Sequence, residues 1–293
     1  IVLAATNLAE HLDEALRRRF DREIEVPLPD REARAAYLAH ELLGRETSQV
    51  TQETIDILAG RSAGMTIADL RRIVNEAAVM AARQASPLTD EIVDEAFEKI
   101  RMGEASRTPD AKTLERIARH EAGHALIGWL TGNLPVQVTI VGRGSAGGYV
   151  EREAEEEKII YTLPELQNLI CQSMAGRAAE MLYYGDAEGL STGVASDLRH
   201  ATGLAERMIR EYGMSPGIGQ IYLDERAARE GALASQINQA AEQIVRAQLE
   251  RALQALRDHK DAIDRLSAEL LEKNRLERSD LERILPPPGG MKA

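Results

Sequence analysis

The segment His-Glu-Ala-Gly-His at residues 120–124 constrains this chain more than any other feature. Histidines four residues apart lie one turn apart on the same face of an α-helix, so a helix here would let both imidazoles reach one ion. A metal held by two neutral imidazoles and a third protein ligand keeps a position for water, and an adjacent glutamate can take that water's proton. The segment therefore predicts a zinc-dependent hydrolase in which His120 and His124 bind the metal and Glu121 is the general base.

A third metal ligand must come from elsewhere in the chain. The candidates are Asp197, Glu180 and His200, each on a predicted helical stretch. Asp197 follows a turn-like segment, where an acid at a helix start also stabilises the helix dipole. Glu180 lies inside a predicted helix over residues 167–183. Spacing alone does not choose among the three, so all of them stay open at this point.

Charge and composition limit the classes of function. A net charge of −12 offers no basic surface for a nucleic-acid backbone, so we do not expect nucleic acid as a partner. Aromatic residues make up only 3% of the chain, while Ala and Leu are abundant, which favours helices. A single cysteine, Cys171, excludes an internal disulfide, and we predict a core thiol there.

The first residues predict a strand. Residues 1–5 form an unbroken apolar run, typical of a strand buried on both faces of a parallel sheet, and only residues 23–28 offer another strand nearby. Because such a strand needs neighbours, we expect residues 1–29 to be the end of a larger α/β domain and the chain to be a fragment. The sequence has no apolar run of 18 residues, so we expect the fragment itself to be soluble.

The rest of the chain predicts two helical units. Amphipathic patterns in residues 30–103 indicate a helical subdomain, and the small, polar, Pro-containing composition of residues 104–110 predicts a linker. The next helix should begin with Asp110 or Thr113 as its cap.

Residues 111–285 predict a mainly helical domain with a small sheet, formed by β-like runs at 136–141 and 149–152. Residues 286–293 predict a disordered tail, because this end is rich in Pro and Gly. The fold class expected for the whole chain is mainly α, with a remnant of an α/β core and a small β-sheet.

The downstream half resembles the peptidase domain of the FtsH-type membrane-anchored AAA proteases. In that family the histidine pair and the aspartate of a Ser/Asn-Asp-Leu segment bind zinc. The resemblance therefore implies His120, His124 and Asp197 as ligands, Glu121 as the catalytic base and Glu180 as a group that orients a ligand histidine. It leaves His200 as an ordinary helix residue. The matching segments are residues 119–126, 138–140, 148–149, 176–180, 191–193, 196–198 and 212–215.

The upstream half resembles the end of the same family's ATPase module. This implies that residues 1–29 end the AAA α/β core and that residues 30–103 form its helical lid. Asn7 would sense the nucleotide's γ-phosphate, and Arg19 would be an arginine finger for a neighbouring subunit. Two residues of the family's Leu-Arg-Pro-Gly-Arg-Phe pattern are missing here, so Arg17 is only a guess for a second finger. The matching segments are residues 5–7, 12–16 and 19–22.

No Gly-x-x-x-x-Gly-Lys-Ser/Thr loop occurs in the sequence, so we expect no ATP hydrolysis by this chain alone. The resemblance implies a full-length protein that binds ATP and Mg²⁺, forms a homo-hexamer and carries membrane-spanning segments absent from this chain. Its protease domain would lie on the cytoplasmic face and degrade unfolded or membrane proteins. The β-like run at 148–152 would hold an extended substrate by main-chain hydrogen bonds.

Two readings from other classes compete with the enzyme. The chain could be a proteolytically inactive assembly or regulatory module, or an ATPase lid plus adaptor whose histidine pair belongs to a core. The intact motif at residues 120–124 favours the enzyme over both.

Overall fold

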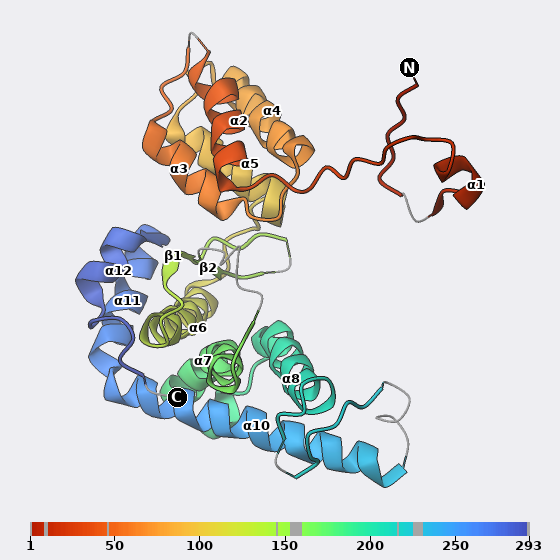
Figure 1. Ribbon diagram of the computed structural model, residues 1–293. Helices are drawn as coiled ribbons and strands as arrows, with labels where there is room; N and C mark the ends of the chain where they lie inside the picture. The colour runs from red at the N-terminus through yellow and green to blue at the C-terminus, as the bar shows by residue number, and fades with distance from the viewer. Residues whose placement is uncertain are drawn as a thin grey trace.

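The computed structural model describes residues 2–8, 11–45, 47–144, 146–152, 160–215, 217–224 and 231–291. In this part the chain is mainly helical with one small sheet, so the predicted fold class is confirmed (Figure 1). The elements run α1 (Glu14–Arg17), α2 (Arg31–Leu43), α3 (Gln52–Arg61), α4 (Ile67–Gln84), α5 (Asp90–Met102), α6 (Ala111–Leu130), β1 (Pro135–Thr139), β2 (Tyr149–Arg152), α7 (Leu163–Glu188), η2 (Thr192–Val194), α8 (Ala195–Arg210), α10 (Gly231–Asp258), α11 (Lys260–Lys273), β3 (Arg275–Glu277) and α12 (Arg278–Ile284).

The N-terminal segment differs from the strands predicted for it. Residues 2–5 and 23–28 form no strand, and their apolar side chains, among them Leu3 and Val26, are exposed. An extended segment becomes a strand only when a neighbour satisfies its backbone groups, and none of the described strands pairs with these residues. The segment runs away from the α2–α5 helices, and its described residues include the short helix α1 (Figure 1).

Helices α2 to α5 pack into one bundle, called the α2–α5 bundle below. Its helices begin at polar caps: the Asp30 side chain accepts from Ala33 N at 2.8 Å, and Thr66 and Asp69 form a capping box at the start of α4. Apolar positions spaced three and four residues apart then face a shared core. The core side chains are Leu38, Leu42, Val50, Ile55, Leu58, Leu70, Ile73, Val74, Ala77, Ala81, Leu88, Ile92, Val93, Ala96 and Phe97.

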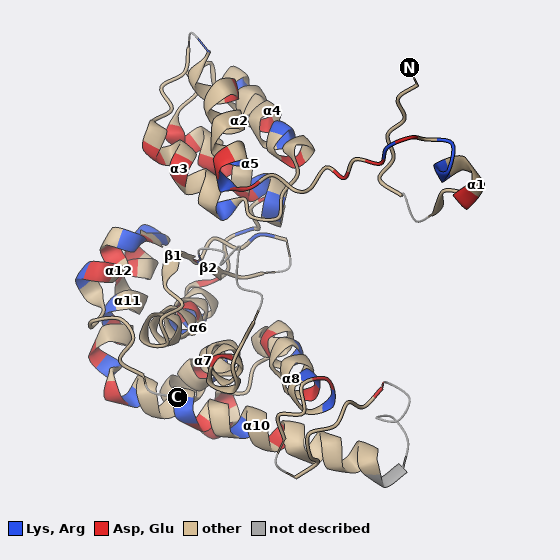
Figure 2. Cartoon of the chain, in the orientation of Figure 1, with Lys and Arg blue, Asp and Glu red and all other residues tan. Residues whose placement is uncertain are grey.

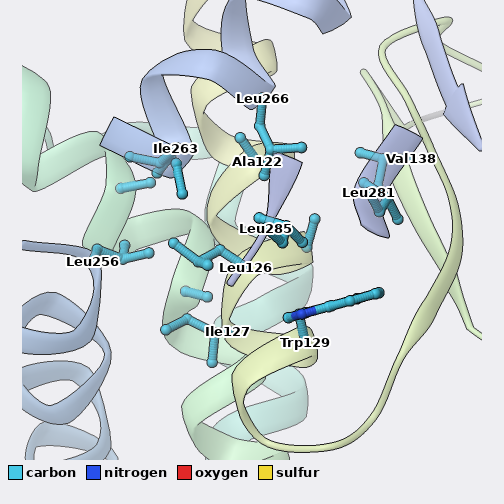
Figure 3. Close-up of a cluster of buried hydrophobic side chains, with 14 of the residues drawn as sticks. Ala122, Leu126, Ile127, Trp129, Val138, Leu256, Ile263, Leu266, Leu281 and Leu285 are labelled. Carbon is cyan, nitrogen blue, oxygen red and sulfur yellow. The ribbon is translucent and has the colours of Figure 1, made fainter. Parts of the chain in front are cut away.

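Helix α6 forms the centre of the second part of the molecule. Asp110 caps it by accepting from Thr113 N at 3.1 Å, which places the helix start where the sequence predicted it. One face of α6 packs against α7 and another against α11, while the sheet covers a third (Figure 1). Figure 3 shows side chains from α6, α11, α12 and the sheet meeting in this core, with Leu126, Leu266 and Val138 among them.

The sheet has three antiparallel strands in the order β2-β1-β3. Val138 of the central strand faces Val150 on one side and Leu276 on the other. The sequence predicted β1 and β2 but no strand at residues 275–277. Strand β3 forms there because Asn274 ends α11 in a left-handed conformation (φ 61°) and turns the chain back along β1.

A second apolar cluster holds α8 and α10 against α7. It is formed by residues such as Ile170, Ala205, Met208 and Ile237. None of the described helices is long and apolar enough to cross a membrane.

Residues 286–291 are held against the end of α6, in contrast to the predicted disordered tail. Trp129 Nε1 donates to the carbonyl of Pro286 at 2.6 Å, and Met291 N donates to Leu130 O at 3.0 Å. The carbonyls at the end of a helix lack partners within it, and this segment supplies donors to two of them, those of Trp129 and Leu130. Residues 292–293 lie outside the described part of the chain.

Ion pairs join the α2–α5 bundle to the sheet, and this contact is called the bundle–sheet junction below. Figure 2 marks the charged residues along the chain by colour. Arg61 Nε lies 2.7 Å from Glu151 Oε2 as an ion pair, and Glu98 accepts from Arg143 Nε at 3.0 Å and from Gln137 at 2.8 Å. The Arg61, Glu98 and Glu151 side chains are 5% exposed or less. The remaining members are Asp94, Glu95, Arg101 and Arg275.

Candidate metal centre

The predicted metal-binding segment lies on α6, where the helix passes α7 at close range. A Cβ on Gly123 would lie 2.7 Å from the Ala179 Cβ and 2.8 Å from the Ala175 carbonyl oxygen, so only glycine fits at this crossing. Glycine inside a helix costs about 1 kcal/mol relative to alanine, and this close contact is the reason for it here. The close approach places His120 and His124 directly against α7.

Three potential ligand atoms face one another at the point where α6, α7 and α8 meet. The Nε2 atoms of His120 and His124 are 3.1 Å apart, and Asp197 Oδ2 lies 3.3 Å from each of them. Asp197 is in the first turn of α8, directly after η2. Among the described residues this is the group of His, Cys, Asp and Glu side chains with the spacing of a metal site.

The second nitrogen of each imidazole has its own partner. His120 Nδ1 lies 2.9 Å from Glu180 Oε1, and His124 Nδ1 lies 2.8 Å from the carbonyl oxygen of Gln172. Both partners are acceptors, which favours a proton on each Nδ1 and leaves the Nε2 lone pairs directed at each other and at Asp197. Glu180 is held in turn by Arg116 at 2.6 Å and Ser191 at 3.0 Å.

This geometry fits a tetrahedral zinc site. Zinc–nitrogen and zinc–oxygen bonds of about 2.0–2.1 Å at tetrahedral angles separate the ligand atoms by about 3.3 Å. The three separations of 3.1, 3.3 and 3.3 Å agree with that value. Three lone-pair acceptors this close repel one another unless a cation lies between them.

The electrostatics of the site favour positive charge between the ligands. Without a metal ion, burial lowers the pKa of His120, but hydrogen bonds to Asp197 and Glu180 outweigh this effect and raise that pKa to about 10, so a proton on Nε2 competes with a metal ion for the same position. Burial raises the pKa of Asp197, and its contacts with His120 and His124 lower it by more, well below the usual range. The carboxylate of Asp197 is therefore ionised at neutral pH and can act as a metal ligand.

Glu121 lies on the side of α6 that faces the start of β2. It is 7% exposed, and burial raises the pKa of its carboxyl group, with His120 and His124 lowering it in part. A Cβ on Gly148 would lie 2.9 Å from Glu121 Cγ and 2.7 Å from Thr139 O, so glycine at this position lets the strand and the glutamate approach each other. The candidate base thus lies between the ligand histidines and the edge strand β2.

The family model for peptidase family M41 matches residues 107–284, which include α6, α7, α8 and the sheet. The chain belongs to peptidase family M41. The prediction of a zinc metallopeptidase domain is confirmed at the level of the family.

Three similar proteins are named as ATP-dependent zinc metalloproteases, one of them FtsH and two of them FtsH 2. The protein of Sphaerobacter thermophilus is 35% identical over 98% of this chain and 45% of its own length. The protein of Bacillus subtilis is 34% identical over 97% of this chain and 47% of its own length. The protein of Symbiobacterium thermophilum is 37% identical over 97% of this chain and 50% of its own length. The chain thus spans about half the length of the curated relatives that it matches.

Two residues of this M41 site were missed by the sequence analysis. A Cβ on Gly176 of α7 would lie 2.3 Å from His120 Nε2 and 2.6 Å from His124 Nε2, so the imidazoles occupy the space that a side chain there would need. Gln172, one turn earlier, presents its carbonyl to His124. The available signal for Gly176 was a glycine inside the predicted helix over residues 167–183. The contact of Gln172 gave no such signal, because it is made by a backbone carbonyl, which every residue has.

The other predicted site residues lie apart from the metal centre. His200 is exposed on α8 and is not one of the three grouped ligands. Asn7 and Arg19 lie exposed in the N-terminal segment, and Arg17 pairs with Glu23 at 2.7 Å. Cys171 is fully buried in the core, as predicted, and burial raises the pKa of its thiol to about 12.

Proposed function

We propose that this chain is a zinc-dependent endopeptidase in which His120, His124 and Asp197 hold the ion. The observation that carries the proposal is the triangle of two Nε2 atoms and one carboxylate oxygen, with sides of 3.1, 3.3 and 3.3 Å. Zinc held by three such ligands supplies a Lewis acid and lowers the pKa of water in the remaining position.

The chain's own residues divide the remaining work. Glu121 takes the proton of the attacking water and delivers it to the leaving amine, a role supported by its burial beside both histidines. Glu180 and the Gln172 carbonyl orient the two imidazoles through Nδ1. Strand β2, an outer strand of the sheet beside Glu121, offers main-chain groups to an extended polypeptide substrate.

Two variants test the site. Zinc content by mass spectrometry is expected to fall in Asp197→Ala and to stay at the wild-type level in Glu121→Gln, which loses hydrolysis of casein. His200→Ala serves as the matched control, because His200 is on the same helix as Asp197 but is exposed. Unchanged zinc in Asp197→Ala would transfer the third-ligand role to Glu180 or His200. Zinc binding without hydrolysis by the wild-type chain would favour the inactive assembly module instead.

We further propose that the degradation of unfolded or membrane proteins depends on ATP bound by sequence outside this chain and on assembly with further copies. The support is that the relatives are named ATP-dependent zinc metalloproteases, together with the lack of a phosphate-binding loop in the sequence. An assay of ATP turnover by this chain is expected to give none, and normal turnover would overturn the proposal. Four points stay predictions from the family resemblance. They are Asn7 as a nucleotide-sensing residue, Arg19 as an arginine finger, a hexamer, and a membrane anchor with the protease domain on the cytoplasmic face.

A further inference from the structure

Arg152 is a shielded cation beside the candidate metal centre, and the proposed mechanism gives it no role. It is the last residue of β2, and its guanidinium reaches across to α6. Its Nη2 donates to the backbone carbonyl of His124 at 3.1 Å, and its Nε is shielded from solvent without a hydrogen-bond partner among the described residues. Shielding a guanidinium is costly, so its surroundings must compensate for it.

Helix α6 makes room for this guanidinium one turn after His124. A Cβ on Gly128 would lie 3.1 Å from Arg152 Nη2 and 3.2 Å from its Nε. Glycine in a helix costs about 1 kcal/mol relative to alanine, and here it allows the planar group to lie against the helix backbone. Burial lowers the pKa of this guanidinium to about 10, and the charges of Glu121 and Asp197 offset part of that effect.

The residue before Arg152 is bound on the opposite face of the strand. Successive side chains of a strand point to opposite faces, so Glu151 faces the α2–α5 bundle while Arg152 faces α6. Glu151 pairs with Arg61 Nε at 2.7 Å and also with Arg101. Strand β2 is therefore held from both sides, and it keeps the Glu151 contacts if the Arg152 contact is removed.

We propose that Arg152 is a positioning residue of the peptidase, which fastens the end of β2 to the His120–His124 turn and so sets how a substrate strand lies against the metal centre. The inference rests on the proposed function, because it assumes that β2 binds the substrate. Arg152 acts through the His124 carbonyl and the strand, not on the reacting atoms. Its loss should weaken substrate binding more than it slows the chemical step.

The test compares Arg152→Gln, Arg152→Lys and wild type in the zinc-loaded chain, with a short unstructured peptide that needs no unfolding before cleavage. Losing a charged hydrogen bond is expected to raise KM about 10-fold in the Gln variant, with kcat changed less than KM. The Lys variant keeps a charge and a donor and should recover part of this loss. Zinc content should stay at the wild-type level in both variants.

Arg278→Gln is the matched control. Arg278 Nη2 also reaches a backbone carbonyl, that of Leu134 at 3.5 Å, and its Nε is likewise shielded, but the residue lies in α12 and contacts no ligand histidine. It should leave KM and kcat unchanged. A fall in kcat with unchanged KM in Arg152→Gln would overturn the proposal in favour of direct contact with the reacting atoms, and wild-type kinetics in that variant would overturn it outright.

A readout independent of hydrolysis separates this proposal from the proposed function. In metal-free protein, backbone amides of residues 149–152 should exchange with solvent faster in Arg152→Gln than in wild type, while amides of α4 stay unchanged. Unchanged exchange at β2 would overturn the positioning role even if the wild-type chain cleaves peptides. A wild-type chain that cleaves no peptide, with faster exchange in the variant, would instead count against the proposed function alone.

Discussion

Two interfaces position the candidate site, and they are built from opposite kinds of residue. Helix α6 meets α7 through Gly123, Ala179 and Gly176, whose lack of bulk lets the backbones and imidazoles approach. The bundle–sheet junction is built from buried arginines and carboxylates such as Arg61 and Glu98. The first interface cannot accept an added methyl group, whereas the second cannot lose a charge, because a buried ion without its partner is costly. The geometry of the candidate metal site thus depends on shape, and the link between the bundle and the sheet depends on charge balance.

Among substitutions at the two interfaces, the largest effect on stability is expected from Arg61→Met, which removes a cation from the junction. Glu98 and Glu151 would lose a buried partner, which should lower the free energy of unfolding by about 3–5 kcal/mol. Urea denaturation measures the change. Arg72→Met is the control, because the Arg72–Asp69 pair is exposed and should contribute less than about 1 kcal/mol. Equal effects of the two substitutions would contradict the role assigned to charge.

The next largest effect is expected from Gly176→Ala, which adds one methyl group beside the imidazoles. The new Cβ would lie 2.3 Å from His120 Nε2, so the histidine must move out of the ligand triangle. Zinc affinity should fall about 100-fold or more, measured by competition with a chelator. Gly203→Ala on α8 is the control, since a Cβ there meets no atom within 4 Å. Wild-type zinc affinity in Gly176→Ala would show that the crossing tolerates added bulk.

A smaller loss is expected from Gly123→Ala at the same crossing. Alanine favours the helix more than glycine does, but crowding against Ala179 and the Ala175 carbonyl should destabilise the fold by more. We expect a net loss of about 1–2 kcal/mol in the free energy of unfolding. Thermal or urea unfolding checks this value. A stabilised variant would mean that α6 and α7 can separate without penalty.

The smallest expected effect is a pH dependence at the junction. Burial raises the pKa of Asp94, but Arg61 and Arg275 lower it by more, so the folded pKa lies below the ordinary value. The stabilisation is present above the unfolded pKa of about 3.9 and is lost as pH falls through the lower folded pKa. The difference in unfolding free energy between wild type and Asp94→Asn should therefore shrink on acidification to pH near 3, measured in urea. A difference that does not change with pH would mean that the charge of Asp94 does not stabilise the junction.

Much of the candidate site could be predicted from the sequence, because the signals for it lie within a few neighbouring residues. The four-residue spacing of His120 and His124 predicts a shared helix face, and Asp110 marks the start of that helix. The predicted strand over residues 149–152 is the observed β2. Strand β3 was missed because three residues are too few to show an alternating pattern, and their pairing depends on the turn at Asn274.

The three candidates for a third ligand show why other features needed the three-dimensional structure. From the residues alone Asp197, Glu180 and His200 were equal candidates, and only the family resemblance favoured Asp197. The structure separates them by direction: the Asp197 oxygen reaches both Nε2 atoms, the Glu180 oxygen reaches Nδ1, and His200 is exposed. Spacing along a chain does not encode which atom of a ring a distant carboxylate meets.

By itself, the sequence determined the helical class, the histidine pair with its glutamate and the two main strands, because each depends on neighbours within a few residues. The tertiary structure decided which acid lies beside both Nε2 atoms, why α7 needs Gly176, and how Glu151 and Arg152 tie β2 to two different parts of the molecule. These features depend on segments tens of residues apart, brought together by packing and by charge pairing.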